Sequence, residues 1–322
     1  MPQLKDQNIG ESELLVSIII VSFNNFQLLK NCVSSLQNFT YGINFEIIIV
    51  DNNSSEGKIE DVISENSKLK IIKNKTNEGF AKANNKAIEY ANGKYILFLN
   101  NDTEFIEDTI NIILNFVPKI EKDFIIGCRL LNKDGSNQVS IVDFTNLLNL
   151  FGESFFLYKL FPKSKLFNRN HLNYKKISQP IEVDYVKGAF LFCSGNLVKQ
   201  LGGFDERFYF YSEEADLCYR AKKNGFHVIF YPGTSIVHLG NATAINNLWF
   251  FFKNQKTAKI QLFQKHFHGL KYFLAVCIYH AGILIRIPIY LFHGVLTLDL
   301  FLIKKSYYFF RQAFVFPKNN FK

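Results

Sequence analysis

Four short runs of apolar and β-branched residues recur in the first hundred positions of the chain. They read LVSIIIVSF at 15–23, FEIIIVD at 45–51, LKIIKN at 69–74 and KYILFLN at 94–100. Runs of this length and composition are typical of strands that are buried on both faces. The stretches between them, such as FQLLKNCVSSLQNF and FAKANNKAIEYANG, space their apolar residues as helices do. This alternation predicts an α/β fold with a parallel sheet wrapped by helices.

A short polar cluster follows each of these predicted strands. The clusters occupy residues 23–25, 51–54, 77–80 and 100–102, and the last of them reads NND. Asn and Asp are ordinary turn residues, so a turn explains any single cluster about as well as a binding site does. Ligands of parallel sheets bind beyond the carboxyl ends of the strands, where loops and helix N-termini converge. Four clusters at the same rim therefore favour a binding site.

The second half of the chain has a less regular pattern. A helix is predicted near 107–119, and Asp134 with Gly135 predicts a hairpin or tight turn. Residues 143–180 show no clear period and are interpreted as a variable insertion over the site. Strand and helix patterns resume at 183–240, where Gly202 with Gly203 and then Gly225 mark the ends of helices.

The densest group of acids lies in YSEEADLCYR at 211–220. Glu213, Glu214 and Asp216 fall in the first turn of a predicted helix, where the helix macrodipole favours acids for structural reasons alone. Asp216 can also pair with Arg220 one turn later. The functional alternative is that one of the two glutamates acts as a general base and deprotonates an acceptor hydroxyl.

His238 ends the apolar run of SIVHLG and also has two interpretations. A lone histidine in such a place is more often a satisfied core residue than a ligand. If the fold brings it to a carboxylate, the imidazole and the carboxylate form a reasonable site for a divalent cation, and Asp102 is the available acid. The two residues are 136 positions apart, so their proximity cannot be deduced from the sequence.

Five segments occur in the order found in family 2 glycosyltransferases. They read VSIIIVSFNN, IIIVDNNSSEG, NEGFAKANNKAIEYANGKYILFLNND, GGFDERFYFYSEEADLCYRAKKNG and VHLGNAT. Over roughly residues 16–241 the chain resembles these enzymes, and most closely their bacterial rhamnosyltransferase-like branch, which builds cell-surface polysaccharides. The resemblance implies the GT-A fold, a Rossmann-like, mostly parallel sheet flanked by helices. Each segment alone is a weak signal, whereas five in this order are specific.

The resemblance also implies roles for individual residues. Asp51 would hold the base or ribose of a nucleotide sugar, while Asp102 would meet its diphosphate through Mg²⁺ or Mn²⁺ and His238 would complete the metal site. Glu214 falls at the position of the family's catalytic aspartate, next to Glu213. The other residues implied at the nucleotide sugar are Ser22, Asn24, Asn77, Gly79, Phe80, Asn84 and Asn101, and those implied near the donor sugar or acceptor are Gly188, Ala189, Asp205 and Glu206.

Two positions depart from the family pattern. Glu214 is one methylene longer than an aspartate, so either its backbone lies slightly farther back or Glu213 takes the role of base. Asn100 and Asn101 replace the acids of a full DxD motif, although this Asn-rich version is common in the branch. With fewer carboxylates, less charge offsets the dehydration of the metal, and we expect weaker metal binding before the donor arrives.

The mechanism that the resemblance implies is inverting, metal-dependent transfer by a single in-line displacement. The donor would be a UDP or dTDP sugar and the transferred group a hexosyl or deoxyhexosyl unit. Glu214 would remove the acceptor proton on the side opposite the leaving nucleoside diphosphate. The implied acceptor is a polyprenyl-diphosphate-linked glycan of cell-surface polysaccharide synthesis.

The net charge of +9 lies almost entirely in the last quarter of the chain. Residues 246–322 carry 11 Lys or Arg and one acid, and runs such as LWFFFK mix cations with aromatics, as interfacial segments do. The apolar stretch 269–300 contains cations, histidines and a proline, and its best part, 272–285, is shorter than the roughly 20 residues that a spanning helix needs. A hairpin of helices in the plane of an anionic membrane is therefore predicted, and nucleic acid is the poorer candidate partner.

These patterns divide the chain into an N-terminal extension (1–12), a GT-A domain (13–245) and a basic, aromatic-rich, membrane-associating helical region (246–322). The first dozen residues lack the features of a secretory signal, and the five scattered cysteines form no metal-ligand spacing. We expect a cytoplasmic enzyme, peripheral on the inner face of the cell membrane. A nicotinamide oxidoreductase would need GxGxxG after the first strand, where SFNNFQ has no glycine. A catalytically inactive binding protein with the same fold, docked to membrane or nucleic acid by its basic tail, is the alternative.

Overall fold

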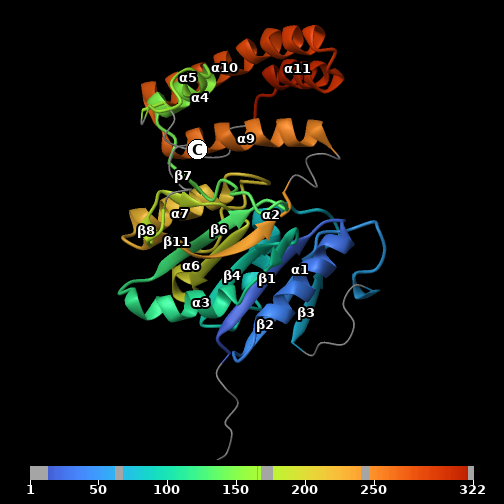
Figure 1. The fold of residues 1–322 in the computed structure, drawn as a ribbon, viewed down its shortest axis with the longest axis vertical. Helices are drawn as coiled ribbons and strands as arrows, with labels where there is room; N and C mark the ends of the chain where they lie inside the picture. The colour runs from blue at the N-terminus through green and yellow to red at the C-terminus, as the bar shows by residue number, and fades with distance from the viewer. Residues whose placement is uncertain (1–13, 62–67, 165, 168–176, 241–246, 318–322) are drawn as a thin grey trace, which may run out of the picture.

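The computed structural model of the chain (Figure 1) describes residues 14–61, 68–164, 166–167, 177–240 and 247–317. Within these ranges, nine strands form one central sheet and two further strands pair separately. The central strands are β1 (Val16–Ser22), β2 (Phe45–Asp51), β3 (Leu69–Lys73), β4 (Tyr95–Asn100), β5 (Thr103–Phe105), β6 (Phe124–Leu131), β8 (Ile181–Glu182), β10 (Phe190–Ser194) and β11 (His227–His238). The separate pair is β7 (Ile141–Val142) and β9 (Tyr185–Val186).

The sheet is mostly parallel and has the order β3-β2-β1-β4-β10-β6-β11-β5, with β8 paired to β11. Strand β10 runs antiparallel to both β4 and β6, and β5 runs antiparallel to β11. The four strands predicted in the first hundred residues are confirmed, and so is the α/β fold class with a mostly parallel sheet. Helices flank the sheet (Figure 1). They are α1 (Phe26–Phe39), α2 (Phe80–Ile88), α3 (Thr109–Phe116), α6 (Gly195–Leu201) and α7 (Glu213–Lys223).

Strand β1 explains why the apolar runs are uninterrupted. Ile18 and Ile20 face one core layer together with Leu29 of α1, whereas Ile19 faces a second layer together with Leu217 of α7. All of these side chains are fully buried. A strand that packs helices on both faces needs apolar side chains at every position rather than at alternate positions.

The strand register brings the polar clusters to one rim of the sheet. Ser22 at the end of β1 pairs with Asp51 at the end of β2, and Val21 pairs with Asn100 at the end of β4. At the end of the strand order opposite to β3, His238 at the end of β11 pairs with Thr103 at the start of β5. The backbone N–H of Leu239 donates to the carbonyl oxygen of Asp102, which fixes the end of β11 beside the polar cluster that follows β4.

Three long helices follow the sheet domain. Helix α9 (Leu248–His266) lies between the sheet domain and the pair formed by α10 (Gly269–Leu296) and α11 (Leu300–Ala313) (Figure 1). Of the described helices, only α10 is long and apolar enough to cross a membrane. The prediction that the apolar stretch is too short was wrong in this respect. Arg286, a charged residue within α10, donates hydrogen bonds to the backbone carbonyl oxygens of Glu153, Ser154 and Gly282. The helix continues through Pro288.

The described part of the insertion does not cover the rim of the sheet. It forms α4 (Leu147–Ser154) and α5 (Leu157–Leu160), and α4 packs against α10. An added Cβ at Gly282 of α10 would come within 2.7 Å of the Cβ of Ser154, so the two helices approach closely there. The interpretation of 143–180 as an insertion over the site is therefore corrected for α4 and α5, while residues 165 and 168–176 lie outside the described ranges.

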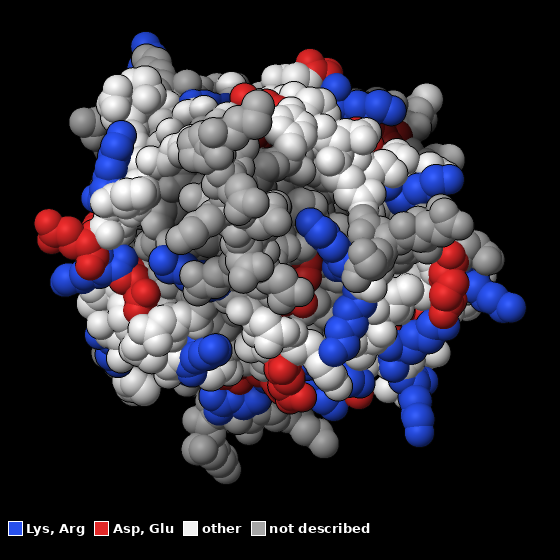
Figure 2. Space-filling model, turned by 90° about the horizontal axis from the view of Figure 1, so that it is seen from below, with Lys and Arg blue, Asp and Glu red and all other residues white. Residues whose placement is uncertain are grey.

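The face remote from α10 and α11 carries both signs of charge. Lys and Arg alternate with Asp and Glu around its visible edge (Figure 2). This mixture agrees with the sequence, because residues 1–245 are close to neutral and the basic excess belongs to the C-terminal region.

Candidate active site

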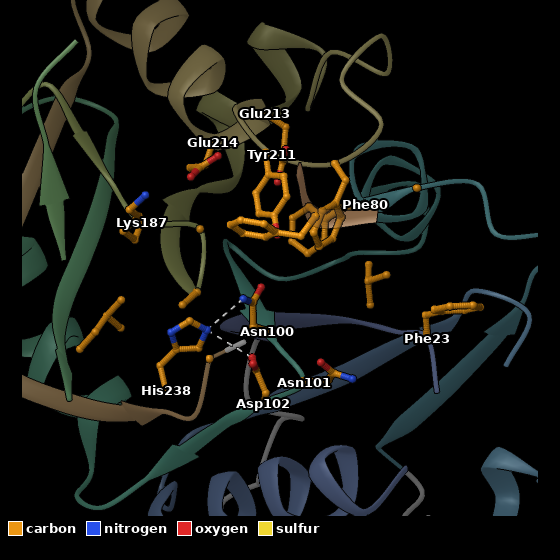
Figure 3. Close-up of a pocket in the computed structure, with 18 of the residues that line it drawn as sticks. Phe23, Phe80, Asn100, Asn101, Asp102, Lys187, Tyr211, Glu213, Glu214 and His238 are labelled. Carbon is orange, nitrogen blue, oxygen red and sulfur yellow. Dashed lines mark hydrogen bonds and ion pairs between the residues drawn. The ribbon is translucent and has the colours of Figure 1, made fainter. Parts of the chain in front are cut away.

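A cavity of about 580 Å³ opens at the carboxyl ends of the parallel strands. One wall is polar and comes from the ends of β4 and β11, and the opposite side carries two acids at the start of α7 (Figure 3). A third wall is aromatic. The polar wall contains Asn100, Asn101, Asp102 and His238, the acids are Glu213 and Glu214, and the aromatic wall includes Phe80, Tyr209, Phe210, Tyr211, Phe250 and Phe251.

The imidazole of His238 and the carboxylate of Asp102 meet on the polar wall. His238 Nε2 lies 3.3 Å from Asp102 Oδ1 and 3.4 Å from Asn100 Nδ2. The other ring nitrogen, Nδ1, lies 2.6 Å from Oε1 of Gln138. The amide of Gln138 is oriented by its Nε2, which donates to the backbone carbonyl of His238 and to Asn132 Oδ1. Its oxygen therefore accepts a hydrogen bond from the N–H of Nδ1.

This arrangement prepares His238 as a ligand. With Nδ1 protonated, the lone pair of a neutral imidazole is on Nε2 and points toward Asp102. Two lone-pair atoms that face each other at 3.3 Å favour a cation between them. Two ligands at about 2.1 Å from one metal ion and at right angles lie about 3 Å apart, close to the observed separation.

The protein supplies few charged ligands for a metal. Among the described residues, no group of three or more His, Cys, Asp and Glu side chains gathers into a metal site. Asp102 and His238 therefore fit Mg²⁺ or Mn²⁺ only as a partial set, with phosphate oxygens and water as the remaining ligands. Mg²⁺ is typically held in this way, by one or two carboxylates and substrate phosphates.

The two glutamates at the start of α7 differ in burial and environment. Glu213 is only 6% exposed and Glu214 is partly exposed. Each has one buried carboxylate oxygen without a hydrogen-bond partner in the described structure. Burial first, and then the charge of Glu214, raise the pKa of Glu213 well above its usual value. In Figure 3 the carboxylate of Glu214 points into the cavity above Lys187, whereas Glu213 lies beside the ring of Tyr211.

The backbone before α7 is turned sharply, and this turn presents the two acids. Tyr211 has φ 74° and Ser212 φ 68°, both in the left-handed region that side chains other than Gly rarely adopt. Gly188 lies against Glu214, because an added Cβ there would be 3.4 Å from the Cβ of that residue. Gly188 and Ala189 both line the cavity, next to Glu214.

Asn52 organises the edge of the cavity near the ends of β2 and β3. Its Nδ2 donates to Asn77 Oδ1 at 2.9 Å and to the carbonyl oxygen of Gly79 at 3.1 Å, and its Oδ1 accepts from the N–H of Glu78. Gly79 has φ 86°, and an added Cβ would come within 2.5 Å of the carbonyl oxygen of Tyr209. Only glycine fits there without a shift, which explains the NEGF sequence before α2.

Four residues implied at the nucleotide sugar lie at the same rim without lining the cavity. Ser22 is buried and accepts from Asn101 Nδ2 at 3.3 Å, while Asp51 accepts from the N–H of Ser54. Asn24 has φ 56° and its side-chain oxygen accepts from the N–H of Ser55. Asn84 lies within α2, and its side chain donates to the carbonyl oxygen of Phe80. Their roles at a nucleotide stay predictions.

Asp205 and Glu206 lie away from the cavity lining. Asp205 pairs with Arg207 and with Lys265 of α9, at 2.6 Å in each case, and these partners hold the pKa of its carboxyl below the usual value although burial opposes this. Glu206 accepts a hydrogen bond from Asn85 of α2. The structure thus gives both acids structural contacts, and their predicted proximity to donor sugar or acceptor stays untested.

Several residues of the site were not predicted from the sequence. Gln138 and Asn52 act through side-chain hydrogen bonds that no local pattern indicates. Lys187 is the one Lys or Arg in the described lining of the cavity. Phe250 and Phe251 come from α9, in a segment interpreted only as membrane-associating. The nearest available signal was the aromatic run LWFFFK, whose position in space depends on the tertiary fold.

Comparison with known proteins agrees with this fold. The profile of the family described as Glycosyl transferase family 2 matches residues 17–188, more than half of the chain. The O-antigen biosynthesis protein RfbC of Myxococcus xanthus is 26% identical over 231 residues, which are 71% of this chain and 17% of that protein. The UDP-Glc:alpha-D-GlcNAc-diphosphoundecaprenol beta-1,3-glucosyltransferase WfgD of Escherichia coli is 31% identical over 116 residues, 36% of this chain and 46% of that protein.

The aligned region thus spans less than half of either relative's length. Among solved structures, the mannosyltransferase PcManGT from Pyrobaculum calidifontis, in complex with GDP-Man and Mn²⁺, superposes with a TM-score of 0.55 at 13% identity. The match covers 92% of this chain and 85% of that one, and it shows a shared fold. The chain belongs to glycosyl transferase family 2 and has the GT-A fold, as its motifs predict.

Proposed function

We propose that this protein is an inverting, metal-dependent glycosyltransferase of cell-surface polysaccharide synthesis. It transfers a hexosyl or deoxyhexosyl group from a UDP or dTDP sugar to a hydroxyl of a polyprenyl-diphosphate-linked glycan, on the cytoplasmic face of the membrane. The observation that carries this proposal is the position of Glu214, which faces the Asp102–His238 pair across one cavity. A base and a diphosphate site on opposite sides suit an in-line displacement.

The donor end of the proposed site is the rim formed by β1, β2 and β4. The nucleoside lies near Ser22 and Asp51, and its diphosphate lies at Asn101 and Asp102. Asp102 and His238 would hold Mg²⁺ or Mn²⁺, which when bound supplies positive charge for the leaving diphosphate. The amides of Asn100 and Asn101 add neutral donors where negative charge develops.

The acceptor end of the proposed site is the part of the cavity next to the start of α7, where Glu214 lies. Glu214 accepts the proton of the acceptor hydroxyl as that oxygen attacks the anomeric carbon of the donor. Burial and then the charge of Glu214 raise the pKa of Glu213, which favours the protonated form of Glu213 and makes its neighbour the better candidate for the base. Lys187 and the N-terminal end of α7 place positive charge beside the two acids. This assignment favours Glu214 over Glu213 as the base.

The names of two relatives support the choice of acceptor. WfgD is named as a glucosyltransferase that uses UDP-Glc and acts on α-D-GlcNAc-diphosphoundecaprenol, and RfbC is named for O-antigen biosynthesis. The GDP-Man and Mn²⁺ of the structural neighbour are likewise that protein's own ligands.

The C-terminal helices support the membrane location. Large apolar side chains stand exposed at the α10–α11 turn and along both helices, among them Leu270, Phe273, Phe292, Leu298, Leu300 and Phe314. Leu298 is 86% exposed and Leu300 79%. A soluble surface rarely exposes so many neighbouring apolar residues, whereas a membrane interface requires them.

The proposal is tested by nucleotide release. The full chain is incubated with a panel of UDP and dTDP sugars and Mn²⁺ or Mg²⁺, and the nucleoside diphosphate is quantified with and without polyprenyl-diphosphate-linked GlcNAc. We expect at least one donor to be consumed only when metal is present, and this activity to be lost in Asp102→Asn. Asn100→Asp should keep the activity and bind the metal as tightly as wild type or more tightly. Metal-independent release, or full activity of Asp102→Asn, contradicts the proposal.

A further inference from the structure

A second cavity, of about 460 Å³, lies at the first turns of α9 and next to the catalytic one. Its described lining consists of Tyr209, Asn247, Trp249, Phe250, Lys253 and Asn254. Tyr209 and Phe250 line both cavities, so the two share a wall. The second cavity therefore adjoins the catalytic one across these two rings.

This second cavity is cationic and aromatic. Lys253 is exposed and has no ion pair within the described part of the chain, and no acid is found in the cavity's described lining. The guanidinium of Arg311, from α11, lies 3.9 Å from the centre of the Trp249 ring. Trp249 thus shares the cavity lining with one cation, Lys253, and its ring contacts a second, Arg311; no described carboxylate pairs with either. Such a place suits an anionic group attached to an apolar chain.

The second cavity also borders the apolar helices. Trp249 stacks with Tyr308 of α11 at 6.4 Å between ring centres, and Phe252 of α9 packs edge-on against Phe309 of α11 at 4.9 Å. The side chain of Gln312 donates to the carbonyl oxygen of Phe252. The first turns of α9 therefore contact the catalytic cavity on one side and the α10–α11 pair on the other.

The order of these features matches the chemistry of a lipid-linked sugar. In such an acceptor the phosphate groups lie between the sugar, which must reach the catalytic base, and the hydrocarbon chain, which must remain in an apolar environment. A site for the phosphates must then lie between the catalytic cavity and the apolar helices. The Lys253 cavity is the described site in that position.

We propose that the cavity formed by Tyr209, Trp249, Phe250 and Lys253 binds the diphosphate and the first part of the hydrocarbon chain of a lipid-linked acceptor. Lys253 contacts the diphosphate, Arg311 adds positive charge behind Trp249, and the indole and Phe250 cover the adjoining hydrocarbon. This inference rests on the proposed function, because it identifies the acceptor end of the same reaction. It makes α9 part of acceptor recognition.

Trp249 is the chain's single tryptophan and reports on this cavity directly. The full-length protein is titrated with farnesyl diphosphate, with farnesol and with inorganic pyrophosphate while tryptophan fluorescence is recorded. We expect saturable change with farnesyl diphosphate and at least tenfold weaker responses to the other two probes. Lys253→Gln should weaken farnesyl diphosphate binding about tenfold, as expected for loss of one charge-assisted contact. Lys304→Gln, an exposed cation of α11 outside the described lining, is the matched control and should bind like wild type.

Other results of these titrations would overturn the inference. Equal binding of pyrophosphate indicates a free phosphate site, and equal binding of farnesol indicates a purely apolar groove. An unchanged affinity in Lys253→Gln, or an equal loss in Lys304→Gln, removes the specific role of Lys253. Binding of UDP with Mn²⁺, followed by calorimetry, should be the same in wild type and Lys253→Gln, since the donor lies in the other cavity. Failure of nucleotide release with intact farnesyl diphosphate binding would reject the proposed transfer reaction and leave this site standing.

Discussion

At the scale of single residues, the candidate metal site depends on a side chain that does not touch the metal position. Gln138 accepts from Nδ1 of His238 and so directs Nε2 toward Asp102. Hydrogen-bond partners of this kind fix the tautomer and the orientation of a ligating histidine. Because Asp102 and His238 are the only carboxylate and imidazole that the described residues offer at this position, we expect the orientation of each to matter strongly for metal affinity.

Replacing Gln138 tests this. Gln138→Leu removes the acceptor for Nδ1–H while keeping a similar volume, and we expect the affinity for Mn²⁺ in the presence of UDP to fall about 10- to 100-fold. The measurement is a titration of activity or of bound Mn²⁺ by electron paramagnetic resonance. Asn132→Ala, which removes the contact behind Gln138, should have a smaller effect. Unchanged Mn²⁺ affinity in Gln138→Leu would mean that Gln138 does not orient the ligand.

Glu213 gives a second residue-scale prediction, in stability against pH. Its pKa is raised in the folded state by burial and by Glu214, so the folded protein binds more protons than the unfolded chain above pH about 4.5. This contribution to stability is therefore lost as the pH rises toward the folded-state pKa. Glu213→Gln carries no such penalty, so we expect its Tm to exceed that of wild type by a margin that grows from pH 5 to pH 8. A margin that is constant or shrinks with pH contradicts the raised pKa.

At the scale of elements, α9 is fixed to the catalytic helix α7 by buried charges. Asp216 of α7 is fully buried and accepts from Arg220 at 2.7 Å, from Lys265 at 2.6 Å and from His266 at 2.9 Å. Lys265 and His266 thereby hold α9 against the start of α7, where Glu214 lies two residues before Asp216. Charge-assisted contacts of this kind hold the pKa of Asp216 below its usual value although burial acts to raise it.

Breaking this contact should cost stability. Lys265→Met leaves Asp205 and Asp216 each with one cation fewer in a buried setting, and we expect the free energy of unfolding to fall by about 1.5–3 kcal/mol. Urea denaturation followed by circular dichroism measures the difference. Lys58→Met, at an exposed position, is the matched control and should change stability by less than about 0.5 kcal/mol. A similar loss in both variants would exclude a specific role for the α7–α9 contact.

The elements predicted most reliably from the sequence are those with local signals. The strands β1, β2 and β4 follow from their apolar runs, and the rim follows from the polar residues that end them. Strand β3, at the edge of the sheet, was predicted from LKIIKN, whose lysines are exposed. Gly135 in the hairpin turn also has the expected positive φ. The packing of α4 on α10 and the entry of Phe250 into the catalytic cavity could not be predicted, because both join segments far apart in the chain.

The residues of the candidate site also divide into those with a sequence signal and those without one. Asp102, His238, Glu213 and Glu214 were identified from their residue types and from family order, and the structure brings all four to one cavity. The side chains that orient them were not identified, because Gln138 lies in an ordinary polar turn with no distinguishing pattern. Sequence reasoning finds the charged groups of a site, whereas their supports depend on tertiary contacts.

At the scale of the whole molecule, the charge of the C-terminal region is partly used inside the protein. Lys256 donates to backbone carbonyls at the end of α11, Lys259 to Thr145, and Arg286 to carbonyls of α4. We therefore expect the exposed apolar surface of α10 and α11 to be the larger contribution to the proposed membrane binding. This shifts the expected mechanism from electrostatic attraction toward apolar insertion.

Vesicle flotation distinguishes these contributions. Replacing Phe292 and Leu296 together by Asp removes two apolar contacts worth about 1.5–3 kcal/mol each, so we expect binding to vesicles with 20% anionic lipid to weaken by at least about 100-fold. Raising NaCl to 1 M, where the Debye length is about 3 Å, should reduce wild-type binding only modestly. Tyr41→Asp, an exposed apolar position on the catalytic domain, is the control. Full release of wild type by salt would assign the binding to charge.

The central claim is that Glu214 removes the acceptor proton while Glu213 remains protonated. The direct measurement is the turnover of wild type, Glu214→Gln and Glu213→Gln, side by side, with the donor identified in the nucleotide-release panel and a lipid-linked acceptor. We predict that Glu214→Gln loses about 10²–10⁴-fold in kcat, as for removal of a general base, and that Glu213→Gln stays within about tenfold of wild type. Undiminished turnover in Glu214→Gln, or a larger loss in Glu213→Gln, would contradict the account.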